Sequence, residues 1–318
     1  MTDIWPIFAS VSGVFLVMLV GASCRRFGCL RRESDHSLAS LITNALLPAY
    51  FISRILAGPQ FDSSFSAWQP PVFGFVMTSL GFGISFLVAK SIGPKLGLMN
   101  DSQQRSFALC VGICNYGYVP LPLAESFYPD SLVSLILHNV GVDLSLWSVG
   151  VAIISGGGGK AWHQVLLSPP FLAVFIACCL KPFLGPAEIP AMLLFVFDTL
   201  GNCAIPLGLL LSGAIMMDFL ADTSWMKSYA VGLTAILIRQ LLLPCLMIGI
   251  ALLFAVGSPM KEVVLLQAAM PAAVFPIVLV RLYDRDTTIS IQVIVSTSLA
   301  GLVLIPAWLL LGQLILST

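Results

Sequence analysis

Charged residues are scarce in this chain, since Asp, Glu, Lys and Arg together make up 9% of its 318 residues while hydrophobic residues make up 58%. A soluble domain carries roughly a quarter charged residues, so the charge present here is too little to cover a globule in water. The mean hydropathy of +0.99 points the same way. The composition excludes a soluble protein and predicts an all-α polytopic membrane protein surrounded by the lipid bilayer.

An excess of positive charge is also missing, because 15 basic residues balance 15 acidic ones. Without a basic face, nucleic acid is not an expected partner. The residues before Ile7 include Asp3 but no Lys or Arg, whereas a secretory signal peptide begins with positive charge. We therefore expect the first apolar run to be retained as a membrane span.

Metal-binding and catalytic motifs are absent from the sequence as well. None of the eight cysteines forms a Cys-x-x-Cys pair, so we expect no metal, no cofactor and no disulfide framework. His138 and Asp143 share one apolar run, as in an imagined intramembrane hydrolase, but no Gly-x-Ser-x-Gly motif or paired His/acid metal signature accompanies them. We predict no catalytic residue and do not expect an enzyme.

Apolar runs of about bilayer length, roughly 20 residues, predict ten membrane spans. They cover residues 4–24, 38–57, 71–89, 106–127, 132–154, 170–184, 189–217, 229–256, 263–282 and 289–316. The sixth run is the shortest. Most Lys and Arg residues follow odd-numbered spans, so the positive-inside rule places those loops in the cytoplasm and both termini outside.

Two of these spans contain helix-breaking residues near their centres. The fourth has Gly117, Pro120 and Pro122, and the ninth has Pro271 and Pro276. Proline lacks the N–H that a helix needs, and a broken helix at membrane depth is tolerated only inside protein or beside a water-filled cavity. We expect the two breaks to face each other and form one site. Their half-helix N-termini would favour an anionic solute.

The two halves of the chain carry similar patterns. Asn44 and Asn202 each stand four residues before a proline, in the second and seventh spans. We predict a first five-helix repeat at residues 1–155, a glycine-containing cytoplasmic linker at 156–168 and a second repeat at 169–318. Because five is odd, the second repeat must enter the membrane from the opposite side, which makes the pair inverted and lets the fourth and ninth spans cross.

Polar side chains near the breaks are the candidate solute contacts. Asn115 offers both a donor and an acceptor, and it either contacts solute or satisfies carbonyls that the prolines release. Tyr116 either closes over a solute or packs. Asn44 and Asn202 either contact solute or join neighbouring helices through hydrogen bonds.

Ionisable side chains within the spans form a second set of candidates. Asn139 and Asp143 share one helix face with His138 beside them, and Asp198 lies in the seventh span. Such groups usually face the bundle interior and serve function, so His138, Asp143 and Asp198 are candidates for proton or sodium coupling. The alternative is a structural hydrogen bond. Arg239 is expected to reach the membrane surface or to pair with one of these acids.

Several of these motifs are shared with one known family. Asn115 stands seven residues before Pro122, which Leu123 follows; Pro271 and Pro276 are five residues apart; and Tyr283 lies in the exit of the ninth span. A segment at 202–208 and a proline at 306 match as well. With these motifs the whole chain resembles the auxin efflux carrier family, which includes plant auxin exporters and bacterial malate or malonate permeases. Pro120 departs from the family, which has glycine there.

The resemblance implies a ten-span inverted repeat similar to bile-acid symporters and sodium/proton antiporters. One part would be a scaffold that forms a homodimer, and the other a transport domain that contains the crossover. The expected function is secondary transport of a small organic anion by alternating access, in the inner membrane of a bacterium. A non-transporting membrane sensor with the same pocket, or a carrier for a neutral or sterol-like solute, are the alternatives.

Overall fold

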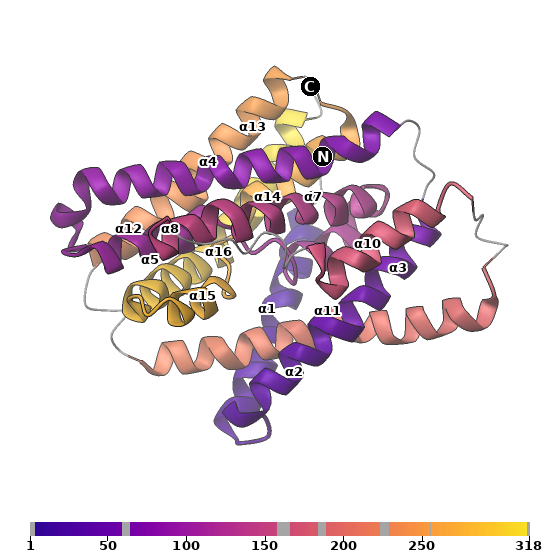
Figure 1. The fold of residues 1–318 in the computed structure, drawn as a ribbon, viewed down its shortest axis with the longest axis horizontal. Coiled ribbons are helices and arrows are strands. Elements are labelled where there is room, and N and C mark those ends of the chain that lie inside the picture. Colours follow the sequence, from indigo (N-terminus) through magenta and orange to yellow (C-terminus); the bar gives the residue numbers. More distant parts are fainter. Residues whose placement is uncertain are drawn as a thin grey trace.

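The computed structural model describes residues 4–58, 64–157, 166–183, 189–222, 229–254 and 256–316, and these are almost entirely helical (Figure 1). Across those ranges no β-strand is found, and the one β-type contact is an isolated bridge. Seven of the described helices are long and apolar enough to cross a bilayer. The predicted class, an all-helical polytopic membrane protein, agrees with this architecture.

The helices of the first half follow the predicted spans closely. They are α1 (Ile4–Arg26), η1 (Arg32–Ser34), α2 (Asp35–Leu41), η2 (Ile42–Leu46), α3 (Leu47–Ala57), α4 (Ser64–Leu96), α5 (Asp101–Gly112), α6 (Pro120–Phe127), η3 (Pro129–Ser131), α7 (Leu132–Ser145), η4 (Leu146–Gly150) and α8 (Val151–Ser155). The turns η2 and η4 are π-helical, so α2–η2–α3 and α7–η4–α8 each run on as one span.

The second half is helical as well. Its helices are α10 (Pro169–Leu180), α11 (Ala191–Ala221), α12 (Tyr229–Leu237), the π-helical turn η6 (Ile238–Leu242), α13 (Leu243–Leu253), α14 (Ser258–Ala269), α15 (Pro276–Leu282) and α16 (Thr287–Leu316). The predicted linker is described only in part, because residues 158–165 lie outside the described residues. The boundaries of the two predicted repeats therefore stay a prediction.

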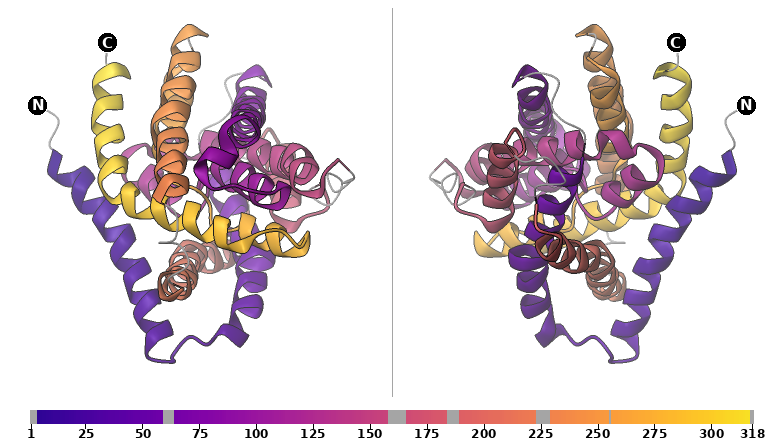
Figure 2. Two further views of the ribbon diagram at one scale, coloured as in Figure 1. Left: turned by 90° about the vertical axis from the view of Figure 1, so that its left-hand side faces the viewer. Right: turned by 90° about the vertical axis from the view of Figure 1, so that its right-hand side faces the viewer.

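Four spans pack together as one group, which we call the α1/α11 group: α1, α2–α3, α10 and α11. Figure 2 shows α1 and α2–α3 as the two arms of a V. Helix α1 lies against α11 so closely that a Cβ on Gly213 would stand 1.8 Å from the Met18 carbonyl oxygen. Small residues allow this approach between helices that gain little from apolar burial in lipid.

Lys181 joins α10 to α3 inside the α1/α11 group. Its side chain is buried, and its ammonium donates hydrogen bonds to the carbonyl oxygens of Ile55 and Gly58, the latter at 2.8 Å. These carbonyls end helix α3, where the last C=O groups have no partner within the helix. A cation is favoured there because the helix dipole is negative at its C-terminus.

The remaining spans form a second group, the crossover group, made of α4 to α8 and α12 to α16. Helix α4 packs along α7 and α5, α12 packs along α16, and α16 contacts α5. At the α4–α7 contact, a Cβ on Gly141 would stand 1.8 Å from the Pro71 carbonyl oxygen. Glycine is therefore required where these two backbones meet.

Two spans of the crossover group are discontinuous, and their gaps lie side by side. Between α5 and α6, and between α14 and α15, the chain is extended, and Cys114 and Ala272 form an antiparallel bridge. The Asn115 N–H donates to the Pro271 carbonyl at 2.7 Å, and the Ala273 N–H donates to the Ile113 carbonyl at 3.3 Å. The prediction that the two breaks meet is confirmed, and each segment satisfies backbone groups that the other exposes.

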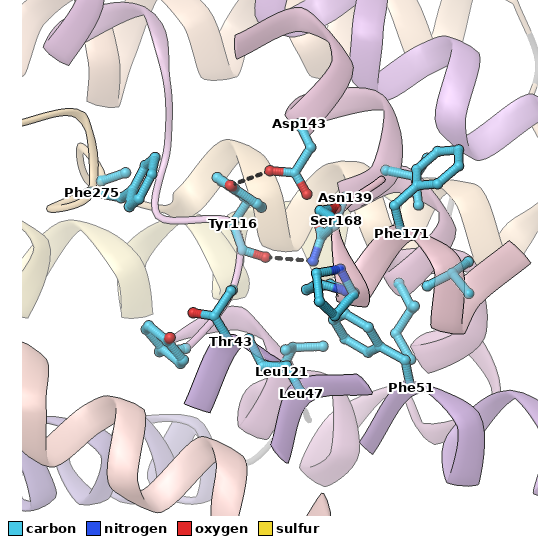
Figure 3. A pocket seen from close by; sticks show the side chains of 18 of the residues that line it. Thr43, Leu47, Phe51, Tyr116, Leu121, Asn139, Asp143, Ser168, Phe171 and Phe275 are labelled. Atoms are coloured by element: carbon cyan, nitrogen blue, oxygen red, sulfur yellow. Dashed lines mark hydrogen bonds between the residues drawn. The ribbon is translucent and has the colours of Figure 1, made fainter. Parts of the chain in front are cut away.

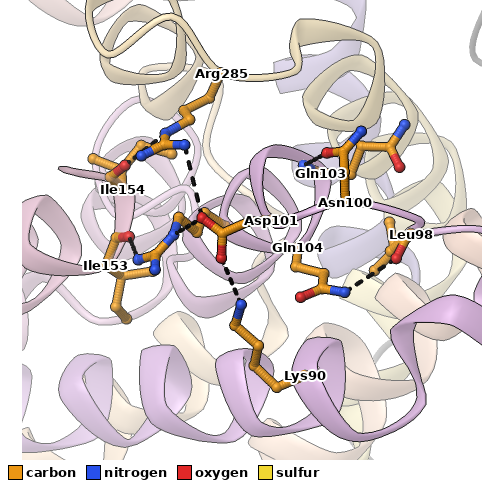
Figure 4. Close-up of polar contacts among 10 residues, drawn as sticks. Lys90, Leu98, Asn100, Asp101, Gln103, Gln104, Ile153, Ile154 and Arg285 are labelled. Carbon is orange, nitrogen blue, oxygen red and sulfur yellow. Dashed lines mark hydrogen bonds and ion pairs between the residues drawn. The ribbon is translucent and has the colours of Figure 1, made fainter. Parts of the chain in front are cut away.

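A charged cluster ties together the ends of several helices in the crossover group (Figure 4). The Asp101 carboxylate, just before the predicted fourth span, pairs with Arg105 and with Lys90 of α4. Arg285, after α15, donates to the Ile154 carbonyl at the end of α8 and lies 3.8 Å from Asp101. The hydrogen bonds from Arg105 and Lys90 lower the pKa of Asp101 from 3.8 to about 2.

Candidate functional site

A cavity of about 280 Å³ lies between the α1/α11 group and the crossover group. Side chains of η2, α3, α10 and α11 line one side, and both extended segments together with α7 and η4 line the other. Its size is close to the lower end of the range for small-molecule sites. Six of the predicted site residues line it: Asn44, Asn115, Tyr116, Gly117, Asn139 and Asp143.

A hydrogen-bond network holds the first extended segment against α7 (Figure 3). The Tyr116 hydroxyl donates to Asp143 Oδ1 at 2.6 Å, and Asn139 Nδ2 donates to the main-chain carbonyl of Tyr116 at 2.8 Å. Tyr116 and Asn139 line the cavity as predicted, and they also have a structural role, because their hydrogen bonds hold the segment between the two half-helices in place.

Gln267, at the end of α14, completes this network and was not singled out from the sequence. Its Nε2 donates to Asn139 Oδ1 at 3.0 Å and to the Tyr116 carbonyl at 3.3 Å, and its Oε1 accepts from Cys114 Sγ at 3.1 Å. Gln267 is fully buried. The available signal was a lone amide in an apolar half-helix four residues before Pro271.

Asn115 differs from Asn139 in what its side chain contacts. Its backbone N–H is bonded across the crossover, but none of the described residues hydrogen-bonds its side-chain amide. The amide is partly exposed and lines the cavity. It therefore keeps one acceptor and two donor hydrogens available for a bound molecule.

The backbone of the extended segment supplies further donors. In the described part of the chain, no group accepts a hydrogen bond from the N–H of Gly117 or of Tyr118. The first turn of α6 is poorer in donors, because Pro120 and Pro122 have none and the Leu121 N–H is bonded to the Gly117 carbonyl at 3.1 Å. The free N–H groups thus lie in the bend and turn at Gly117 and Tyr118, ahead of the half-helix.

Among the described residues that line the cavity, Asp143 is the one ionisable carboxylate, and none of them is Lys, Arg or His. Its described hydrogen bond comes from the Tyr116 hydroxyl, and no ion pair to it is found among the described residues. Any charged molecule in this cavity therefore shares it with Asp143.

Several predicted site residues lie elsewhere. His138 is buried against the Phe73 ring, with the two ring centroids 6.5 Å apart. Pro120, Pro271 and Pro276 shape the crossover backbone and do not line the cavity. These three prolines contribute to the site by interrupting the helices and so setting the course of the backbone.

Pro122 and Asn202 line a second cavity of about 310 Å³, which lies between α1, α3, α6 and α11. Beside it Arg54 donates to Glu125 Oε1 at 2.9 Å and to Asn202 Oδ1 at 3.0 Å. Asp198 accepts a hydrogen bond from Ser53 in the same region. Asn202 and Asp198 thus belong to a network that links the two helix groups, separate from the residues around Asn115.

Arg239 was expected to reach the membrane surface or to pair with an acid, and the structure contradicts both. The residue is 3% exposed, in the π-helical turn η6. Its Nη1 lies 3.5 Å from the Gly112 carbonyl oxygen and its Nη2 lies 3.8 Å from Met247 Sδ. The turn packs on α5 and α16 inside the crossover group.

The two helix groups also meet where the Tyr118 ring lies on α11. A Cβ on Gly208 would stand 2.2 Å from Tyr118 Cε1, so this position accepts glycine only while the ring stays in place.

Two broken helices that meet in a membrane-spanning fold, beside a cavity between two helix groups, are features of membrane transporters. The chain belongs to the membrane transport protein family, which covers the auxin efflux carriers; the family model matches residues 6–161 and 158–309. It is similar to an uncharacterized transporter of Methanothermobacter thermautotrophicus, 23% identical over 94% of this chain and 96% of the relative. It is also similar to an uncharacterized transporter of Methanocaldococcus jannaschii, 22% identical over 93% and 95%.

Proposed function

We propose that this protein is a secondary carrier that moves a small carboxylate across the membrane by alternating access at the crossover. The observation that carries the proposal is the cavity between the two helix groups. The side-chain amide of Asn115 lines this cavity and forms no hydrogen bond with any described residue. A cavity bounded by two packing units is alternately opened when one unit moves against the other. In this proposal the α1/α11 group is the scaffold and the crossover group is the moving part.

A carboxylate is supported by the donors beside the cavity. The side-chain amide of Asn115 and the N–H groups of Gly117 and Tyr118 can each donate to a carboxylate oxygen. Hydrogen bonds to a charged acceptor are stronger than those between neutral groups. The apolar lining from Leu47, Phe51 and other side chains suits the rest of a small organic molecule.

Asp143 supports coupling to a cation, because a second carboxylate in the same cavity is repelled by an ionised Asp143. Binding becomes favourable when a proton or a sodium ion neutralises the pair. His138 and Asp198 are less suited to this role, since His138 is buried against α4 and Asp198 lies in the network around Arg54.

We also propose ten spans in two inverted repeats. The seven long helices, the short α10 and the two broken spans add up to this plan. Its internal symmetry exchanges the first span with the sixth and the second with the seventh. The α1–α11 contact then corresponds to the α10–α3 contact, and the α5–α16 contact to the α14–α7 contact, and all four occur.

The setting of the carrier is part of the same proposal. The distribution of Lys and Arg favours both termini outside, in the inner membrane of a bacterium. The α1/α11 group, as the scaffold, is the part expected to form a homodimer.

The test is uptake by protein reconstituted in liposomes, with radiolabelled malate, malonate and indole-3-acetate, each with and without proton and sodium gradients. We expect flux of at least one carboxylate, and Asn115→Ala should raise its KM about tenfold or more, since hydrogen bonds to a charged group contribute about 1.5–3 kcal/mol each. Asn202→Ala is the matched control and should keep the KM of the wild type. Asp143→Asn should remove the response to the coupling gradient.

Protein that is monodisperse in detergent but moves none of the three acids would contradict the proposed function. Unchanged KM in Asn115→Ala would remove this residue from the site and leave the carrier function standing.

A further inference from the structure

Arg239 carries a positive charge that the described fold leaves without a counter-charge. It is 3% exposed, and its described contacts are a carbonyl oxygen at 3.5 Å and a thioether sulfur at 3.8 Å. Its Nε has no hydrogen-bond partner, and no carboxylate of the described residues forms an ion pair with it. A lone cation at membrane depth is costly, and such residues generally face a pathway or serve function.

Packing alone does not account for this side chain. The contact with the Gly112 carbonyl is at the outer limit of hydrogen-bond length, and an uncharged side chain of similar length would fill the same space at lower cost. The position also lies in a π-helical turn, an irregularity that is often found at functional sites.

The carbonyl that Arg239 contacts belongs to the crossover itself. Gly112 is the last residue of α5, and the extended segment that follows reaches the cavity at Asn115, three residues later. Arg239 is not among the lining residues, so its charge acts on the cavity from behind the broken backbone. The C-terminal end of α5 is negative, and the guanidinium offsets that end.

The cavity needs such a charge. The described lining residues include one carboxylate, Asp143, and no Lys, Arg or His, yet the cavity is proposed to bind an anion. Polar backbone groups and Asn115 donate hydrogen bonds there but carry no net charge.

We propose that Arg239 is the fixed counter-charge of the crossover, a positioning residue that makes the cavity accept anions in preference to neutral molecules of the same shape. The proposal rests on the proposed function, because it concerns the solute of the same cavity. At an effective dielectric constant of about 20, a unit charge roughly 10 Å from an anion changes its affinity by about tenfold or somewhat more.

The experiment compares Arg239→Gln with Arg239→Lys in liposomes. Gln keeps an N–H donor but has no charge, whereas Lys keeps the charge and changes the shape. Arg281→Gln is the matched control, since Arg281 lies in α15 of the same group, is exposed, and has no ion pair among the described residues. The probe is whichever of labelled malate, malonate and indole-3-acetate the wild type carries best, competed by the same unlabelled acid and by its uncharged amide.

We expect Arg239→Gln to raise the KM about tenfold with a smaller change in maximal rate, and to lose the preference for the acid over the amide. Arg239→Lys should keep that preference, and Arg281→Gln should behave as the wild type. Unchanged KM and preference in Arg239→Gln, or equal damage in both Arg239 variants, would overturn the proposal. If Arg239→Gln does not yield folded protein, loss of the acid preference in Arg239→Lys alone overturns it.

Failure of the carrier function is distinguishable from failure of this inference. A wild type that moves none of the three acids refutes both, whereas a wild type that moves one of them, with no effect of the Arg239 charge, refutes this inference alone.

Discussion

Two buried glutamines at the crossover give a sharp comparison, because they share residue type and burial but differ in their hydrogen bonds. Gln267 is fully buried and makes three side-chain contacts, with Asn139, Cys114 and the Tyr116 carbonyl. Gln240 is equally buried, and neither its Oε1 nor its Nε2 has a partner among the described residues. Replacing each by Leu removes the same amide and nearly preserves its volume.

The expected free-energy changes have opposite signs. Gln267→Leu loses two hydrogen bonds that it donates, each contributing about 1 kcal/mol, and leaves Asn139 Oδ1 without its described donor, which costs about 1 kcal/mol more. The sum is a destabilisation of about 2–3 kcal/mol. Gln240→Leu removes an amide that is buried without a partner, so it is expected to be neutral or to stabilise by about 1 kcal/mol.

Apparent melting temperatures of the two variants in the same detergent measure this difference. Gln267→Leu should melt several degrees below the wild type and Gln240→Leu at or above it. Transport should be slower in Gln267→Leu than in Gln240→Leu, because Gln267 holds the segment that carries Asn115. Equal melting temperatures, or a lower value for Gln240→Leu than for Gln267→Leu, would show that the described hydrogen bonds do not hold the crossover together.

Three further predictions concern other contacts. Lys181→Met should lower the apparent melting temperature, by the equivalent of about 1–3 kcal/mol, because it leaves the carbonyls at the end of α3 without their donor; an unchanged melting temperature would refute this role. Gly208→Ala places a Cβ 2.2 Å from the Tyr118 ring and should slow transport, whereas Gly249→Ala, with open space around its Cβ, should not; equal rates would refute it. The lowered pKa of Asp101, about 2 against 3.8 in the unfolded chain, adds stability that is fully present above about pH 4 and lost as the pH falls through 2. Because this side chain is about half exposed, the gain is below about 1 kcal/mol, and Asp101→Asn should make the melting temperature less sensitive to pH between 4 and 2.

The broken spans could be predicted from the sequence because part of the cause is local. A proline removes a donor wherever it stands, and here Pro120 and Pro276 begin α6 and α15 while Pro271 lies in the second gap. Proline alone is not sufficient, because Pro206 and Pro306 lie inside the continuous helices α11 and α16. The requirement that hydrocarbon cannot solvate the exposed backbone then brings the two gaps together. Even the pairing of the segments follows from this, although the register of Cys114 on Ala272 does not.

What could not be predicted depends on partners distant in the sequence. Asn44 and Asn202 have the same spacing to a proline, yet Asn44 lines the main cavity and Asn202 accepts a hydrogen bond from Arg54 beside the second one. In the sequence, Gln267 and Arg239 are both polar residues in apolar surroundings. Only the packing of α14 and η6 against the crossover distinguishes their surroundings.

The source of backbone donors is a further difference between expectation and structure. From helix dipoles, the donors are expected at the first turns of α6 and α15. In α6 the same prolines that open the helix remove donors from that turn, so the available N–H groups lie earlier, at Gly117 and Tyr118.

The contact between the Tyr118 ring and Gly208 affects how one helix group can slide past the other. On α11, Ala204 and Ser212 stand one turn before and one turn after Gly208, and all three are buried. Small side chains therefore recur on this face of α11 every four residues, about 6 Å apart along the helix axis. If the two helix groups slide by one turn, the Tyr118 ring leaves Gly208 and meets a position on α11 that again carries only a small side chain.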